Sequence, residues 1–150
     1  MTIWNAYRDD LVVSIRKQKE LAEKAIHQLN DAEFFRKPGE HSNSVAIIVK
    51  HLAGNLTSQA LLARWDHGFA TFIDAVTRLQ ESDGLRTITI RGEPHSVLQA
   101  IHRALTHTSY HVGQIVYLAR LLKTDGWTWI TIAPGQSKTF NSEPRKYLGT

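Results

Sequence analysis

The sequence predicts an all-α fold, a four-helix bundle, on three observations. Apolar residues recur at spacings of three and four along four stretches of the chain, as in helices that bury one face. Of 150 residues, 42% are hydrophobic, which can supply a core without disulfides. The remaining stretches are a short alternating segment before the last long helix and an irregular C-terminal tail. We expect a single domain that spans residues 1–150.

The first predicted helix runs from about Ile3 to Leu29, with most charged residues facing away from its apolar stripe. That stripe consists of Trp4, Tyr7, Leu11, Ile15, Ala22, Ala25, Ile26 and Leu29. In residues 30–43, Pro38 and Gly39 predict a connection between helices.

The second predicted helix starts at about Ser44, because Ser42 or Ser44 can cap it. On its helical wheel, His51 lies between Ile48 and Leu52 and therefore points toward the core. A third helical stretch follows and ends at Asp83-Gly84. Its apolar residues are Leu62, Trp65, Phe69, Phe72, Ile73, Val76 and Leu79.

The boundary between the second and third helices has two open explanations. No proline interrupts the segment from Asn55 to Trp65, although a helical hairpin needs a few turn residues. The two helices are either one long helix, in which case two chains must exchange halves, or a separating segment is missing near Ser58–Leu61.

The last long helix follows an alternating segment, residues 86–92, which predicts a short strand or extended loop. Pro94 suits the first turn of this helix, which runs to Leu122. Asp125-Gly126 ends it, and the tail 127–150 has no helical period. Its residues expected to pack on the bundle are Trp127, Trp129, Ile130 and Ile132.

A pair of histidines within the last long helix is the strongest functional signal. His107 and His111 lie one turn apart on the same helix face, where two imidazoles can bind one divalent metal ion or form hydrogen bonds. His51 is the candidate third ligand from a neighbouring helix, and Asn55 could support it. No general base stands out among Glu93, His95 and His102.

Composition excludes several other classes of function. The chain has no cysteine, which rules out a disulfide scaffold, a thiolate metal site and a cysteine nucleophile. The formal net charge is +4, but lysines and arginines are scattered, so we expect no nucleic-acid partner. The N-terminus does not resemble a signal peptide, and the longest apolar run, Val45–Val49, is too short to span a membrane. We expect a cytoplasmic location.

The chain resembles the DinB/YfiT-like metalloenzymes, in particular an uncharacterised bacterial branch. The resemblance covers nearly the whole chain and is carried by residues 49–55, 87–95, 107–115 and 132–137, above all by His-x-x-x-His followed by Gly-Gln-Ile. It implies an up-down-down-up four-helix bundle with a long crossover. It also implies a metal site formed by His51, His107 and His111. Relatives of this branch carry additional residues between Leu56 and Ala63.

The resemblance also implies a chemistry. Some relatives bind zinc or nickel and transfer low-molecular-weight thiols or perform hydrolysis. Three histidine ligands leave one position of a tetrahedral metal open, which is typical of catalytic sites. Imidazole suits zinc and nickel alike. We expect a metal-dependent transferase or hydrolase that acts on a small molecule and forms a homodimer, and the alternative is a non-enzymatic bundle that binds a metal or small ligand.

Overall fold

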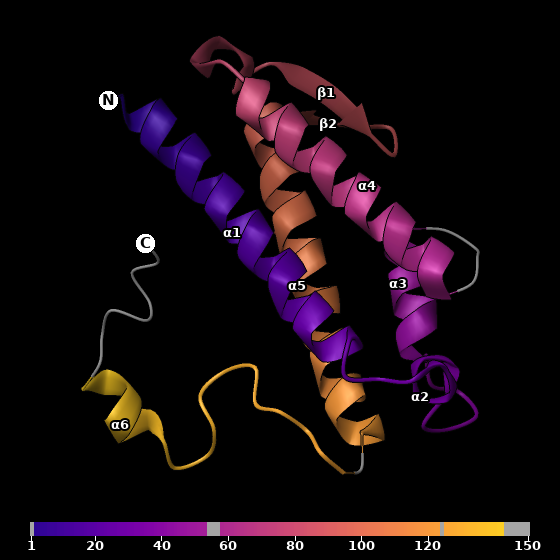
Figure 1. The fold of residues 1–150 in the computed structure, drawn as a ribbon. Coiled ribbons are helices and arrows are strands. Elements are labelled where there is room, and N and C mark those ends of the chain that lie inside the picture. Colours follow the sequence, from indigo (N-terminus) through magenta and orange to yellow (C-terminus); the bar gives the residue numbers. More distant parts are fainter. Residues whose placement is uncertain (1, 54–57, 124, 143–150) are drawn as a thin grey trace.

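A computed structural model describes residues 2–53, 58–123 and 125–142. The chain is mostly helical and carries one small two-stranded sheet (Figure 1). The helices of the main body are α1 (Ile3–Ile26), α3 (Val45–Ala53), α4 (Ser58–Arg78) and α5 (Val97–Leu122). Helix α1 packs against α4 and α5, and α3 packs against the same two helices. The predicted helical class is therefore confirmed.

The core lies between α1, α3, α4 and α5 and uses the apolar stripes of the sequence. Ile15, Trp65 and Ile115 are at most 2% exposed. The predicted stripe of the first helix is buried from Leu11 to Ile26, and Leu29 is partly buried. Tyr7 is 42% exposed, so its assignment to the buried stripe was wrong. Within the described residues, no helix is both long and apolar enough to span a membrane.

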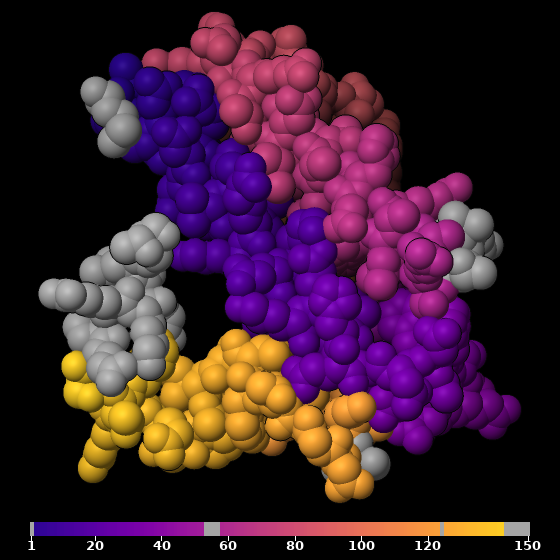
Figure 2. Space-filling view, in the orientation of Figure 1, coloured from indigo at the N-terminus to yellow at the C-terminus, as the bar shows by residue number. Residues whose placement is uncertain are grey.

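Helix α1 ends at Ile26, three residues before the predicted end. Just beyond this end, the side chain of Gln28 hydrogen-bonds to both the Lys24 carbonyl oxygen of the last helical turn and the C-terminal tail. Its amide NH₂ donates to the carbonyl oxygen of Thr128 over 3.0 Å, and its Oε1 accepts from the Thr128 N–H over 2.7 Å. Figure 2 shows the orange tail against the C-terminal part of indigo α1.

The segment predicted as a connection, residues 30–43, contains a short helix, α2 (Asp31–Phe35). Asn30 Oδ1 accepts from the Glu33 N–H, and the Glu33 carboxylate accepts from the Asn30 N–H. This capping box, together with the burial of Phe34, stabilises a helix that is too short to show a helical period. Ser44 caps α3 as predicted, since its Oγ accepts from the Ile47 N–H over 3.2 Å.

Helices α3 and α4 are separate and pack against each other (Figure 1). The single continuous helix considered above is therefore wrong, and the reason for expecting two chains to exchange halves falls with it. Helix α4 begins at Ser58, four residues before the first apolar residue used to predict it. Asn55 and Leu56 lie outside the described residues.

The predicted extended segment is one arm of a β-hairpin formed by β1 (Thr87–Ile90) and β2 (Glu93–Ser96), with Ile90 paired to Glu93. The two turn residues have positive φ angles, 53° at Arg91 and 85° at Gly92, as a tight hairpin turn requires. Pro94 lies in β2, so its assignment to the first turn of α5 is wrong.

The start of α5 is fixed by Ser96 rather than by Pro94. Ser96 Oγ accepts from the Gln99 N–H over 3.1 Å, and Gln99 Oε1 accepts from the Ser96 N–H over 2.8 Å. This reciprocal pair satisfies backbone donors of the first turn and places the helix start at Val97.

The C-terminal tail packs on the helices through some of the residues that were predicted to do so. Trp127 and Ile130 are half-buried against the core, and the Arg120 guanidinium lies 4.0 Å from the centroid of the Trp129 ring. The tail also contains a short helix, α6 (Ser137–Asn141), which the sequence did not predict because five residues carry no helical period. Residues 143–150 of the tail lie outside the described residues.

Candidate metal centre

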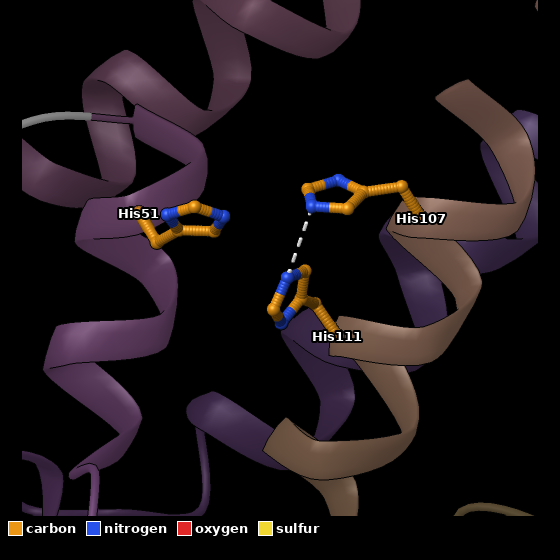
Figure 3. Close-up of side chains that lie close together, drawn as sticks. All are labelled: His51, His107 and His111. Carbon is orange, nitrogen blue, oxygen red and sulfur yellow. Dashed lines mark hydrogen bonds between the residues drawn. The ribbon is translucent and has the colours of Figure 1, made fainter. Parts of the chain in front are cut away.

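The three predicted histidines lie together between α3 and α5 (Figure 3). His51 is in the last turn of α3, and His107 and His111 are one turn apart in the middle of α5. One ring nitrogen from each residue lies within 4.8 Å of the other two. The three rings face a common point from two helices that are packed against each other.

The distances suit a metal ion bound by imidazole. His107 Nε2 and His111 Nε2 are 3.2 Å apart. Two Zn–N bonds of about 2.05 Å at the tetrahedral angle place their nitrogens about 3.3 Å apart. The ring centroid of His51 is 5.4 Å from that of His107 and 4.9 Å from that of His111. Only a small movement of the His51 ring toward the other two rings is therefore needed to complete a set of three nitrogen ligands.

The cluster is open to solvent on one side. His51 and His107 are exposed, and His111 is half-buried. A metal site is closed when three buried ligands and a fourth protein group surround the ion. Three ligands at a surface instead leave one coordination position for a small molecule. The arrangement can therefore accommodate a ligand at a fourth position.

Gln114 orients His111, a role that the sequence analysis did not assign. The His111 Nδ1–H donates to Gln114 Oε1 over 2.8 Å. This bond fixes the imidazole tautomer and leaves the Nε2 lone pair free for a metal ion. The sequence spacing could have indicated this contact, because Gln114 follows His111 by three residues and so shares its helix face.

The electrostatic surroundings keep His107 neutral. Its pKa lies below the ordinary value of 6.5, first because partial burial penalises the charged imidazolium, and then because His111, His51, Arg103 and Arg91 repel a positive charge. Metal ions bind neutral imidazole, so a lowered pKa favours metal binding toward lower pH.

His95 and His102, which the sequence placed near the pair, do not join the cluster. His95 is tied to its own hairpin, with Nδ1 3.0 Å from the Glu93 carbonyl oxygen, and His102 is exposed on α5. Trp65 is a core residue. Tyr110 is 64% exposed, and its ring centroid is 5.2 Å from that of His111, so it borders the cluster.

Replacing Gln114 by alanine is expected to weaken zinc binding by about 10- to 100-fold, because His111 loses the partner that fixes its ring and tautomer. Titration calorimetry with zinc measures the change. Gln114→Glu keeps an oxygen acceptor and serves as the matched control, with affinity expected to stay near the wild-type value. Equal affinity in the alanine variant would remove the orienting role of Gln114.

The pH dependence of stability should reveal the lowered pKa of His107. Because the folded-state pKa is below that of the unfolded chain, the unfolded chain binds more protons as the pH falls below about 6.5, and the free energy of unfolding falls. Urea unfolding of metal-free protein at pH 7.5 and 5.5 measures this loss. We expect a smaller loss in His107→Gln and an unchanged loss in His102→Gln. An identical loss in wild type and His107→Gln would contradict the lowered pKa.

Together these features define a helical protein with three clustered histidines that could hold a metal ion. The chain matches the family model described as "Protein of unknown function (DUF1572)" over residues 2–60 and 56–136. The chain belongs to the DUF1572 family. It matches no curated protein and no solved structure.

The family match includes all three histidines, His51 in its first piece and His107 and His111 in its second. The two pieces meet between α3 and the start of α4, where the sequence analysis considered a missing segment.

Proposed function

We propose that this protein is a metal-dependent enzyme of the thiol-transferase type, with zinc or nickel bound by His51, His107 and His111. The observation that carries the proposal is the convergence of three ring nitrogens within 4.8 Å at a solvent-accessible position. The resemblance to DinB/YfiT-like metalloenzymes and the mutual packing of α1, α3, α4 and α5 support a DinB-like, up-down-down-up four-helix bundle as its scaffold.

Each side chain of the site has a distinct role in this proposal. His107 and His111 supply two ligands from one long helix, so their separation is set by the helix itself. His51 supplies the third from α3, and Gln114 holds the His111 ring. The metal ion, when bound, supplies positive charge that lowers the pKa of a thiol or a water molecule at the open position.

The charges around the site favour an anionic nucleophile. Arg103 and Arg91 are close enough to His107 to lower its pKa, and both cations would attract a thiolate. The cluster contains only histidines, whereas zinc hydrolases of the His-Glu-x-x-His type use an adjacent carboxylate as general base. This difference favours group transfer to a low-molecular-weight thiol.

The transfer is a substitution at carbon. The thiol gives its proton to solvent, and its sulfur lone pair forms a bond with an electrophilic carbon of the second substrate. The leaving group departs with the electrons of the broken bond. Holding sulfur and carbon in contact is the protein's main contribution, since orientation alone can supply much of the rate enhancement.

The test compares metal-free protein with protein reloaded with zinc or nickel. A low-molecular-weight thiol and chlorodinitrobenzene probe group transfer, and nitrophenyl acetate probes hydrolysis. We expect the loaded protein to accelerate only the first reaction, and His51→Ala to abolish the acceleration. Accelerated ester hydrolysis alone would identify a hydrolase. A loaded protein inactive in both assays would favour the non-enzymatic, metal-binding alternative.

The homodimer is a separate proposal. Size-exclusion chromatography with light scattering tests it, with an expected mass of about twice the 17.0 kDa of one chain. A species of 17.0 kDa at every concentration would exclude it.

A further inference from the structure

A cleft lies next to the histidine cluster, between the 38–43 segment, α3 and α5. Its volume is about 490 Å³, within the range of about 300–1,000 Å³ that is typical of small-molecule sites. Its walls are formed by Pro38, Ser42, Asn43, Ile48, Gln114, Tyr117, Leu118 and Leu121. None of these side chains carries a charge.

The cleft and the histidine cluster are neighbours along both helices. On α3, Ile48 precedes His51 by three residues, and on α5, Gln114 follows His111 by three residues. Residues at this spacing share one helix face. Gln114 belongs to both places, because it lines the cleft and accepts the hydrogen bond from His111.

Part of the apolar wall is exposed, whereas Ile48 is buried at 3% exposed. Tyr117 is 70% exposed and Leu121 is 51% exposed, and Leu118 lies between them in sequence. Large apolar side chains gathered at a concave surface mark a place where another apolar surface binds. The polar groups of Ser42, Asn43 and Gln114 offer hydrogen bonds without charge.

We propose that this cleft binds the uncharged, apolar body of the electrophilic substrate, an alkyl chain or aromatic ring, while its reactive end reaches the histidine cluster. This assignment rests on the proposed function, and it deepens that function by naming the substrate class. The substrate is a small amphiphile with its polar, reactive group at one end.

The first test uses a series of n-alkyl hydroxamates, which combine a metal-binding head with an apolar tail of chosen length. Titration calorimetry with zinc-loaded protein gives the dissociation constants from acetohydroxamate to octanohydroxamate. We expect the dissociation constant to fall about two- to fourfold for each added methylene, since a buried CH₂ contributes up to about 0.8 kcal/mol. If the hydroxamates bind but their dissociation constants do not depend on chain length, the cleft does not bind the tail. That result overturns the substrate assignment and leaves the proposed function intact.

A matched pair of variants locates the tail. Leu121→Gln lies in the cleft at a half-exposed position and should weaken octanohydroxamate binding about fivefold while leaving acetohydroxamate unchanged. Leu85→Gln makes the same change at an 82% exposed leucine outside the cleft and should alter neither constant. Equal effects of the two variants overturn the assignment.

A second test needs no metal and so separates the two proposals. Adding 1-octanol to metal-free protein should shift the amide NMR resonances of Ser42, Asn43 and Gln114, but not that of Leu85. If these shifts are absent, the cleft does not bind apolar molecules, and its proposed role is overturned even if the histidines bind zinc. If the shifts are present, they support this role even if the histidines do not bind zinc. A dimer that Leu121→Gln dissociates would instead place a second copy of the chain on the cleft and overturn the substrate assignment.

Discussion

Replacing His111 by alanine is expected to lower zinc affinity by about a hundred- to a thousandfold. A complete zinc site contributes about 10–16 kcal/mol, so one ligand of four accounts for about 2.5–4 kcal/mol, and each 1.4 kcal/mol is a factor of ten. His111 is the central residue of the candidate set. Its Nε2 is 3.2 Å from that of His107, its ring is packed against that of His51, and its Nδ1–H is held by Gln114.

The measurement is metal content and zinc affinity of protein purified without a histidine tag. His51→Ala and His107→Ala should show losses of the same order. His102→Ala is the matched control, because His102 is exposed on the same helix but does not belong to the cluster. Equal metal content in all four variants would rule out the three-histidine site.

Replacing Trp65 by alanine is expected to lower the free energy of unfolding by about 3–5 kcal/mol, as large-to-small changes in a core do. Trp65 is 2% exposed. Its ring centroid is 4.7 Å from that of Phe69. Truncation therefore removes a large apolar contact and leaves a cavity between α4 and its neighbours. Urea unfolding followed by circular dichroism measures the change.

Trp129→Ala serves as the control for this experiment. Trp129 is 39% exposed and is held mainly by the guanidinium of Arg120, a contact worth about 0.5–1 kcal/mol at an exposed site. The decrease in the free energy of unfolding should therefore be several times smaller for Trp129→Ala than for Trp65→Ala. Trp65→Phe should also cost less than Trp65→Ala, because it keeps a ring and removes an indole N–H that has no hydrogen-bond partner within the described residues. Equal losses at Trp65 and Trp129 would contradict the burial described here.

The long helices could be predicted because their periodicity extends over many turns. Leu11, Ile15, Trp65 and Ile115 all belong to stripes visible in the sequence, and all are buried. Helices α2 and α6 could not be predicted in this way, since each has five residues, too few to show a helical period. Helix α2 is stabilised locally by its capping box. Pro94 was misplaced because proline suits both a helix start and an edge strand.

The candidate site could be predicted in part. The spacing of His107 and His111 fixes their proximity on any helix. The expectation that His51 points toward the core was wrong, because His51 is exposed and lies at the surface beside the two histidines of α5 (Figure 3). The distance between α3 and α5 depends on how the helices pack, which a one-dimensional pattern does not contain. The cleft was not foreseen for the same reason, since the 38–43 segment reaches α5 only in the folded chain.

The position of the histidines on two helices far apart in sequence has a consequence for the life of the protein in the cell. An ion shared by α3 and α5 would act as a removable cross-link that closes the long stretch of chain carrying α4 and the hairpin. Because the three ligands come together only in the folded chain, such an ion would add to the resistance of that chain against proteases. Scarcity of the metal would then reduce the amount of the protein.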